Sequence, residues 1–125
     1  MIDQEIDIQT RDGAMNTFIT HPEEGGPFPL VLFYMDAPGK REELHDMARR
    51  IGSVGYYVML PNLYYRRSKD FVMERTDAGR EIMFGHMDSL SIQMVMEDTE
   101  SMFEYAKGQK AVRGGATGAV GYCMS

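Results

Sequence analysis

Cys123 is the only cysteine in this 125-residue sequence and the strongest candidate for a reactive side chain. It follows the apolar, glycine-containing run 118–122, and small residues stand two positions before and after it, at Gly121 and Ser125. This spacing is typical of a nucleophile elbow, a sharp strand-to-helix turn that has no room for bulky neighbours. The pattern therefore predicts a thiol nucleophile where a serine usually stands. The alternative is a buried cysteine that serves only as a small core residue.

The turn 36–39 directly follows a second apolar run, at residues 30–34. In elbow enzymes, two main-chain N–H groups bind the oxyanion of the intermediate, one after the nucleophile and one from a loop of this kind. The N–H groups of Ala37 and Met124 are the corresponding candidates. The alternative for residues 36–39 is a plain turn that leads into a helix.

The histidines His21, His45 and His86 all precede Cys123, whereas the elbow architecture places its histidine after the nucleophile. None of them fits the role of general base. The sequence has no glycine-rich phosphate loop, no paired cysteines and no His-x-x-x-His spacing, so we expect no cofactor and no metal. The arginines of the region 66–80 are expected at the solvated surface, and the alternative is that one of them holds a substrate carboxylate through two hydrogen bonds. Tyr65 either lines the same cleft or packs in the core.

The predicted elements alternate between strands and helices. A hairpin is expected at 5–10 and 14–21, because polar and apolar residues alternate around the turn 11–13. The continuous apolar run 30–34 predicts a central strand buried on both faces. The remaining expected elements are a helix around 44–51, a strand at 56–60, a short helix near 71–75, a helix at 91–107, a glycine-rich stretch at 112–118 and a strand at 119–122. This order predicts an α/β fold with a mostly parallel sheet.

The segments 31–39, 55–64 and 118–124 together resemble the dienelactone hydrolase family of the α/β-hydrolase fold. The resemblance implies hydrolysis of a small ester or lactone, without a cofactor, by attack of Cys123 and formation of a thioester. It also implies that the chain is the N-terminal part of one hydrolase domain, truncated after the elbow. We therefore expect these residues to need the C-terminal part of the fold, and to be inactive without it.

The same resemblance suggests roles for two further residues. Asp36 stands where the family has a glutamate that contacts the resting thiol, and its side chain is one methylene shorter. Arg80 loosely matches an arginine that holds the substrate carboxylate. The family's catalytic aspartate and histidine would follow Ser125 in the sequence.

Composition narrows the range of partners and compartments. The net charge is −6 and no basic stripe is present, which argues against nucleic acid or an anionic membrane as partner. The acidic N-terminus lacks the apolar core of a signal peptide, and a single cysteine suits a reducing compartment, so we expect a cytoplasmic protein. The competing hypothesis for function is a non-catalytic α/β binding module with a packed or redox-sensing Cys123.

Overall fold

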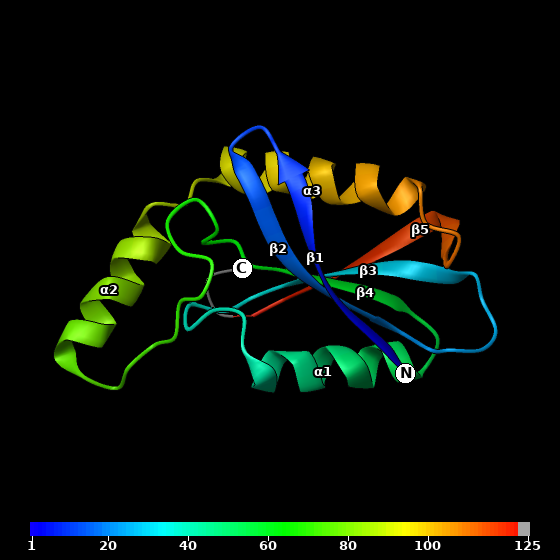
Figure 1. Ribbon diagram of the computed structural model, residues 1–125, viewed down its shortest axis with the longest axis horizontal. Helices are drawn as coiled ribbons and strands as arrows, with labels where there is room; N and C mark the ends of the chain where they lie inside the picture. Colours follow the sequence, from blue (N-terminus) through cyan, green and yellow to red (C-terminus); the bar gives the residue numbers. More distant parts are fainter. Residues whose placement is uncertain (123–125) are drawn as a thin grey trace.

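The computed structural model describes residues 1–122, which form a five-stranded sheet between helices α1 and α3 (Figure 1). A third helix, α2, lies beyond one end of the sheet. The strands are β1 (Ile2–Thr10), β2 (Gly13–His21), β3 (Phe28–Tyr34), β4 (Tyr57–Pro61) and β5 (Val112–Gly121), and the helices are α1 (Glu42–Ser53), α2 (Asp77–Asp88) and α3 (Ile92–Lys107).

The sheet has the strand order β1-β2-β4-β3-β5. β4, β3 and β5 run parallel, whereas the hairpin β1–β2 joins the sheet through antiparallel pairing with β4. The predicted α/β fold class is confirmed, with a mixed sheet in which the hairpin supplies the antiparallel part. Because β4, β3 and β5 are parallel, their carboxyl ends meet at one edge of the sheet, where α/β proteins commonly bind ligands.

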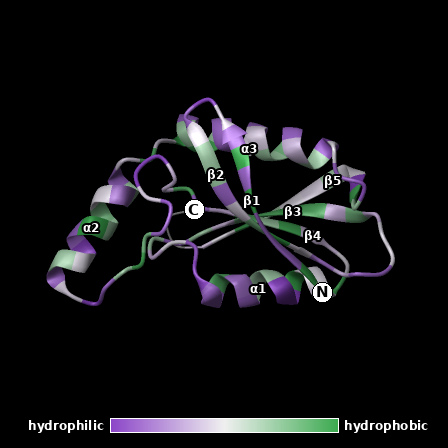
Figure 2. Ribbon diagram, in the orientation of Figure 1, coloured by the Kyte–Doolittle hydropathy of each residue, from purple (hydrophilic) through white to green (hydrophobic). Residues whose placement is uncertain are grey.

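Strand β3 is buried on both faces, as its apolar run predicts. Leu30 and Leu32 pack into the core cluster beneath α3, whereas Val31 and Phe33 pack into the cluster beneath α1. Each of these four side chains is at most 6% exposed. Figure 2 shows hydrophobic stretches in the central strands, whereas the turn between β1 and β2 is hydrophilic.

The short helix predicted near 71–75 is wrong, because the helix of this region is α2, at Asp77–Asp88. Thr76 has extended backbone angles, and its side chain accepts a hydrogen bond from the Gly79 N–H at 3.0 Å. This N-cap fixes the start of the helix, and Asp77 adds a favourable negative charge in its first turn. A threonine followed by an aspartate was therefore the helix signal that the prediction overlooked.

The prediction that residues 112–118 precede the last strand is also wrong, because these residues belong to β5, which runs from Val112 to Gly121. It pairs with β3 along its length, with a register shift between Pro29 and Val31. Pro29 has no N–H to donate to the ladder, which accounts for an irregularity at this point. β5 forms an edge of the sheet and is largely exposed among the described residues.

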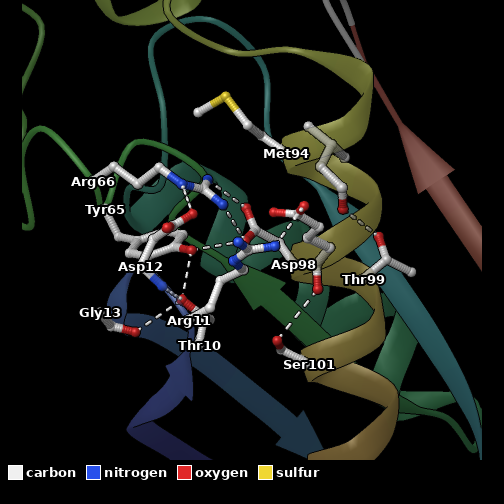
Figure 3. Close-up of polar contacts among 12 residues, drawn as sticks. Thr10, Arg11, Asp12, Gly13, Tyr65, Arg66, Met94, Asp98, Thr99 and Ser101 are labelled. Carbon is white, nitrogen blue, oxygen red and sulfur yellow. Dashed lines mark hydrogen bonds and ion pairs between the residues drawn. The ribbon is translucent and has the colours of Figure 1, made fainter.

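A buried polar network joins α3 to the opposite elements of the fold (Figure 3). The Asp98 carboxylate is fully buried and accepts two hydrogen bonds from the Arg66 guanidinium, both at 2.9 Å. The Tyr65 hydroxyl also donates to Asp98, at 2.8 Å, and lies 2.7 Å from the Thr10 hydroxyl. Arg66 in turn binds Asp12 at 2.8 Å. One carboxylate therefore ties α3 to the loop after β4 and to the β1–β2 turn.

We expect Asp98→Ala to lower the free energy of unfolding by about 3 kcal/mol, because removing one partner leaves the Arg66 charge and the Tyr65 hydroxyl without their buried acceptor. Urea denaturation of the variant measures this loss. Glu97→Ala is the matched control, since the carboxylate of the neighbouring Glu97 has only long contacts within residues 1–122, at 3.4 Å with Arg11 and at 3.4 Å with Gln93. Its expected effect is about 0.5 kcal/mol. Equal losses in the two variants would contradict a stabilising role for the buried network.

Candidate active-site region

Three segments leave the sheet at the carboxyl edge of the parallel strands. β3 leads into the turn 35–41, and β4 leads into the loop 62–68. Gly121 at the end of β5 is paired with Tyr34 at the end of β3. The ring of Tyr122 then lies 5.7 Å from that of Phe33. The end of β5 therefore lies beside the end of β3, where the predicted oxyanion turn begins. The predicted nucleophile Cys123 and the predicted donor Met124 lie outside the described residues.

The turn after β3 presents a main-chain donor that no other described residue uses. The Gly39 N–H donates to the Asp36 carbonyl at 3.0 Å, and Gly39 has a φ of 91°, which favours glycine. Ala37 is 5% exposed, and its carbonyl accepts a hydrogen bond from the Tyr64 hydroxyl at 2.8 Å. No hydrogen bond within residues 1–122 uses the Ala37 N–H. A main-chain N–H held in this way is the kind of preorganised donor that stabilises an oxyanion.

Asp36 forms a bidentate ion pair with Arg41, at 2.6 and 3.1 Å. Arg41 also donates to the Gly39 carbonyl at 2.8 Å, so it braces both ends of the turn. The hydrogen bond to Asp36 is the main reason why the pKa of Arg41 lies above its ordinary value. Sequence reasoning missed Arg41, because a separation of five residues across a turn carries no recognisable signal. The predicted contact between Asp36 and the thiol stays a prediction.

The two adjacent tyrosines of the loop 62–68 lie in different parts of the core. Tyr64 packs in the cluster beneath α1 and reaches the turn through Ala37, whereas Tyr65 packs in the cluster beneath α3. Burial raises the pKa of Tyr65 to about 12, and its hydroxyl is bonded to Thr10 and Asp98. These contacts give Tyr65 a structural role. Its role in substrate binding stays a prediction.

Arg80 lies on an exposed face of α2 and forms an ion pair with Asp77 one turn away. No contact within the described part of the chain joins it to the turn after β3, so its role toward substrate also stays a prediction. His86 on the same helix is 7% exposed and stacks on Tyr64, with ring centroids 5.2 Å apart. Its Nδ1 atom has no hydrogen-bond partner among the described residues.

Two cavities open near this edge of the sheet. A groove of about 580 Å³ lies at the ends of β3 and β4, and its lining is mainly apolar: Tyr34, Leu63, Met87, Leu90, Ser91, Ile92, Val95 and Met96. A smaller cavity of about 270 Å³ touches Gly39 and Tyr64. Within residues 1–122, no cluster of His, Asp or Glu side chains could hold a metal ion, and no helix is both long and apolar enough to cross a membrane.

Comparison with known families decides the assignment of the chain. The family model described as "Dienelactone hydrolase family" matches residues 15–125, which is most of the sequence. The chain belongs to the dienelactone hydrolase family. The resemblance inferred from the three sequence segments is thereby confirmed.

Members of the dienelactone hydrolase family that resemble this chain are longer. A Methylorubrum extorquens protein named carboxymethylenebutenolidase is 28% identical over 123 residues, which are 98% of this chain and 41% of that protein. A Synechocystis protein of the same name is 24% identical, over 95% of this chain and 48% of its own length. The chain thus spans about half the length of the curated relatives it matches.

Solved structures agree with the dienelactone hydrolase fold. A Klebsiella pneumoniae structure described as a dienelactone hydrolase has a TM-score of 0.81 at 21% identity, over 98% of this chain and 50% of that one. A cold-adapted esterase from an Arctic intertidal metagenomic library has a TM-score of 0.71 at 17% identity, with the same coverage. At these identities the likeness concerns the fold alone.

We expect acid to weaken the fold through His86. Burial lowers the pKa of His86, and the positive charge of Arg67 lowers it further. The unfolded chain takes up a proton at a pH of about 6.5, before the folded chain does, so the free energy of unfolding falls below that pH. The loss levels off once the pH is below the folded pKa.

Urea denaturation between pH 7.5 and 5 measures this slope, and His86→Gln is expected to make it shallower. A titration of the His86 ring by NMR gives the folded pKa directly. A midpoint at or above about 6.5 would contradict the expectation.

Proposed function

We propose that the protein containing these residues hydrolyses small esters or lactones with Cys123 as its nucleophile. Membership of the dienelactone hydrolase family supports the reaction class. The observation that carries the proposal is the pairing of Gly121 with Tyr34, together with the Ala37 N–H, which has no hydrogen-bond partner within residues 1–122. In the sequence, Cys123 follows Gly121 by two residues, just as Asp36 follows Tyr34, and this supports a thiol that acts near the turn after β3.

In the proposed reaction the Cys123 thiolate attacks the acyl carbon of the substrate. A bond forms between Sγ and carbon, and the carbonyl oxygen becomes an oxyanion that accepts hydrogen bonds from the N–H groups of Ala37 and Met124. The carbon–oxygen single bond of the ester then breaks, and the leaving oxygen takes up a proton. Water adds to the thioester and releases the carboxylic acid and the free thiol. No redox step or cofactor is required.

The substrate is proposed to be a small ester or lactone that carries a carboxylate, with Arg80 and Tyr65 as candidate contacts. The apolar groove at the ends of β3 and β4 supports an uncharged acyl or alcohol portion, because it is lined by methionine and aliphatic side chains. Asp36 is proposed to contact the resting thiol. Its bidentate contact with Arg41 offsets its negative charge at the site.

The first experiment replaces the thiol. In the whole reading frame that contains these residues, Cys123→Ala is expected to abolish turnover of p-nitrophenyl acetate and of a simple lactone, because the nucleophile is gone. Steady-state kinetics measure the loss, which should be at least about 10³-fold.

Iodoacetamide is expected to alkylate Cys123 and to inactivate the enzyme in proportion to labelling. Full activity after complete labelling would contradict the proposal and favour a binding module with a packed or redox-sensing cysteine. The Ser125→Ala variant is the control for disturbance of the segment near Cys123.

The second experiment tests the contact between Asp36 and the thiol. A carboxylate beside a thiol disfavours the thiolate and raises the thiol pKa. Asp36→Asn is therefore expected to shift the pH profile of iodoacetamide alkylation toward lower pH. Glu43→Gln is the matched control, because Glu43 also faces Arg41, at 3.7 Å, but its side chain is 78% exposed. An unchanged profile in Asp36→Asn would contradict the contact.

A further inference from the structure

We infer that Tyr64 is a positioning residue that holds the oxyanion turn in its working orientation. The inference rests on the proposed function, since it concerns the N–H of Ala37. The Tyr64 hydroxyl donates to the Ala37 carbonyl at 2.8 Å, and Tyr64 is 1% exposed. This hydrogen bond links the loop after β4 to the turn after β3.

The backbone of Tyr64 is itself held in place. Its N–H donates to the Asn62 side-chain oxygen at 3.0 Å, and its carbonyl accepts from the N–H groups of Arg67 and Ser68, both at 2.8 Å. The Asn62 side chain is anchored in turn by Asn16, at 3.0 Å, and by the Ser68 carbonyl, at 2.9 Å. These hydrogen bonds therefore fix the backbone position from which the Tyr64 side chain extends.

The ring of Tyr64 is enclosed by three neighbours. His86 stacks on it at 5.2 Å, and Phe71 meets it edge-on at 5.8 Å. A methyl group built on Gly39 would lie 3.6 Å from the ring, so the turn itself packs against the phenol. Aromatic contacts of this kind restrict the ring to a narrow range of positions. The hydroxyl is consequently directed at the turn.

The orientation of the Ala37 N–H follows from the peptide planes around it. The Asp36–Ala37 peptide is trans, so its carbonyl and its N–H point in opposite directions. Because the Asp36 carbonyl accepts from Gly39, the Ala37 N–H points out of the turn. Tyr64 holds the next peptide plane through the Ala37 carbonyl. Together, the two hydrogen bonds restrict rotation on both sides of Ala37.

This arrangement predicts an effect on chemistry rather than on substrate binding. One oxyanion donor contributes about 10²–10³-fold to turnover, and a displacement of about 1 Å costs much of that. Tyr64→Phe keeps the ring and removes the hydroxyl. We expect kcat for p-nitrophenyl acetate to fall by about tenfold or more, with KM nearly unchanged, since the donor acts mainly in the transition state.

Alkylation of Cys123 by iodoacetamide is the second readout. It is a displacement at a saturated carbon and forms no oxyanion, so Tyr64→Phe is expected to alkylate at the wild-type rate. A merely structural defect would slow both reactions. Tyr57→Phe is the matched control, because Tyr57 is also buried, at 2% exposure, but stands at the amino end of β4. Its kcat is expected to stay within about twofold of wild type.

These measurements use the protein that is encoded by the whole reading frame. A Tyr64→Phe kcat within about twofold of wild type would overturn this inference alone, and so would equal losses of turnover and alkylation. If Tyr64→Phe does not fold, Gly39→Ala tests the same turn, because a side chain is strained at a φ of 91°. Its kcat should fall with alkylation retained, and unchanged turnover would overturn the inference. A wild-type protein without esterase activity would overturn the proposed function, and this inference with it.

Discussion

Burial of β3 on both faces is the constraint on which the other features depend. β3 has the parallel neighbours β4 and β5, which are reached by helical crossovers, and the crossover helices α1 and α3 cover its two faces. Parallel neighbours end at the same edge. The pairing of the strands therefore brings together the turn after β3, the loop after β4 and the end of β5. Contacts between their side chains are not needed for this.

Two sets of polar contacts then hold the loops at that edge. The Asp98 network is internal to the core and connects α3 with the loop after β4. The Asp36–Arg41 pair and the Tyr64–Ala37 hydrogen bond brace the turn after β3. The first set stabilises the packing of α3 on the sheet, although it buries a charge. The second set fixes the orientation of the main chain in the turn after β3. The same loop takes part in both, through neighbouring tyrosines.

The sequence predicted elements where periodicity was strong and missed them where the signal was a single contact. The apolar run 30–34 and the helical spacing from Leu44 to Ile51 correspond to β3 and α1, because burial repeats along the chain. α2 was misplaced because its start depends on the cap at Thr76. Ala37 was proposed from a motif. The contacts of Arg41 with Asp36 and Gly39, and of the Tyr64 hydroxyl with the Ala37 carbonyl, depend on distances that only the folded chain defines. The roles of Cys123, Met124 and Arg80 rest on pattern and family resemblance.

The opposite placement of Tyr64 and Tyr65 has a consequence for how the loop after β4 tolerates change. Asn62 is anchored to β2, so the number of residues between it and the two phenols decides which ring enters which core cluster. Inserting or deleting one residue at Leu63 would misdirect both rings at once, detaching one from the Ala37 carbonyl and the other from Asp98. The length of this loop is therefore fixed by the core on both faces of the sheet, although loops elsewhere on protein surfaces accommodate insertions and deletions readily.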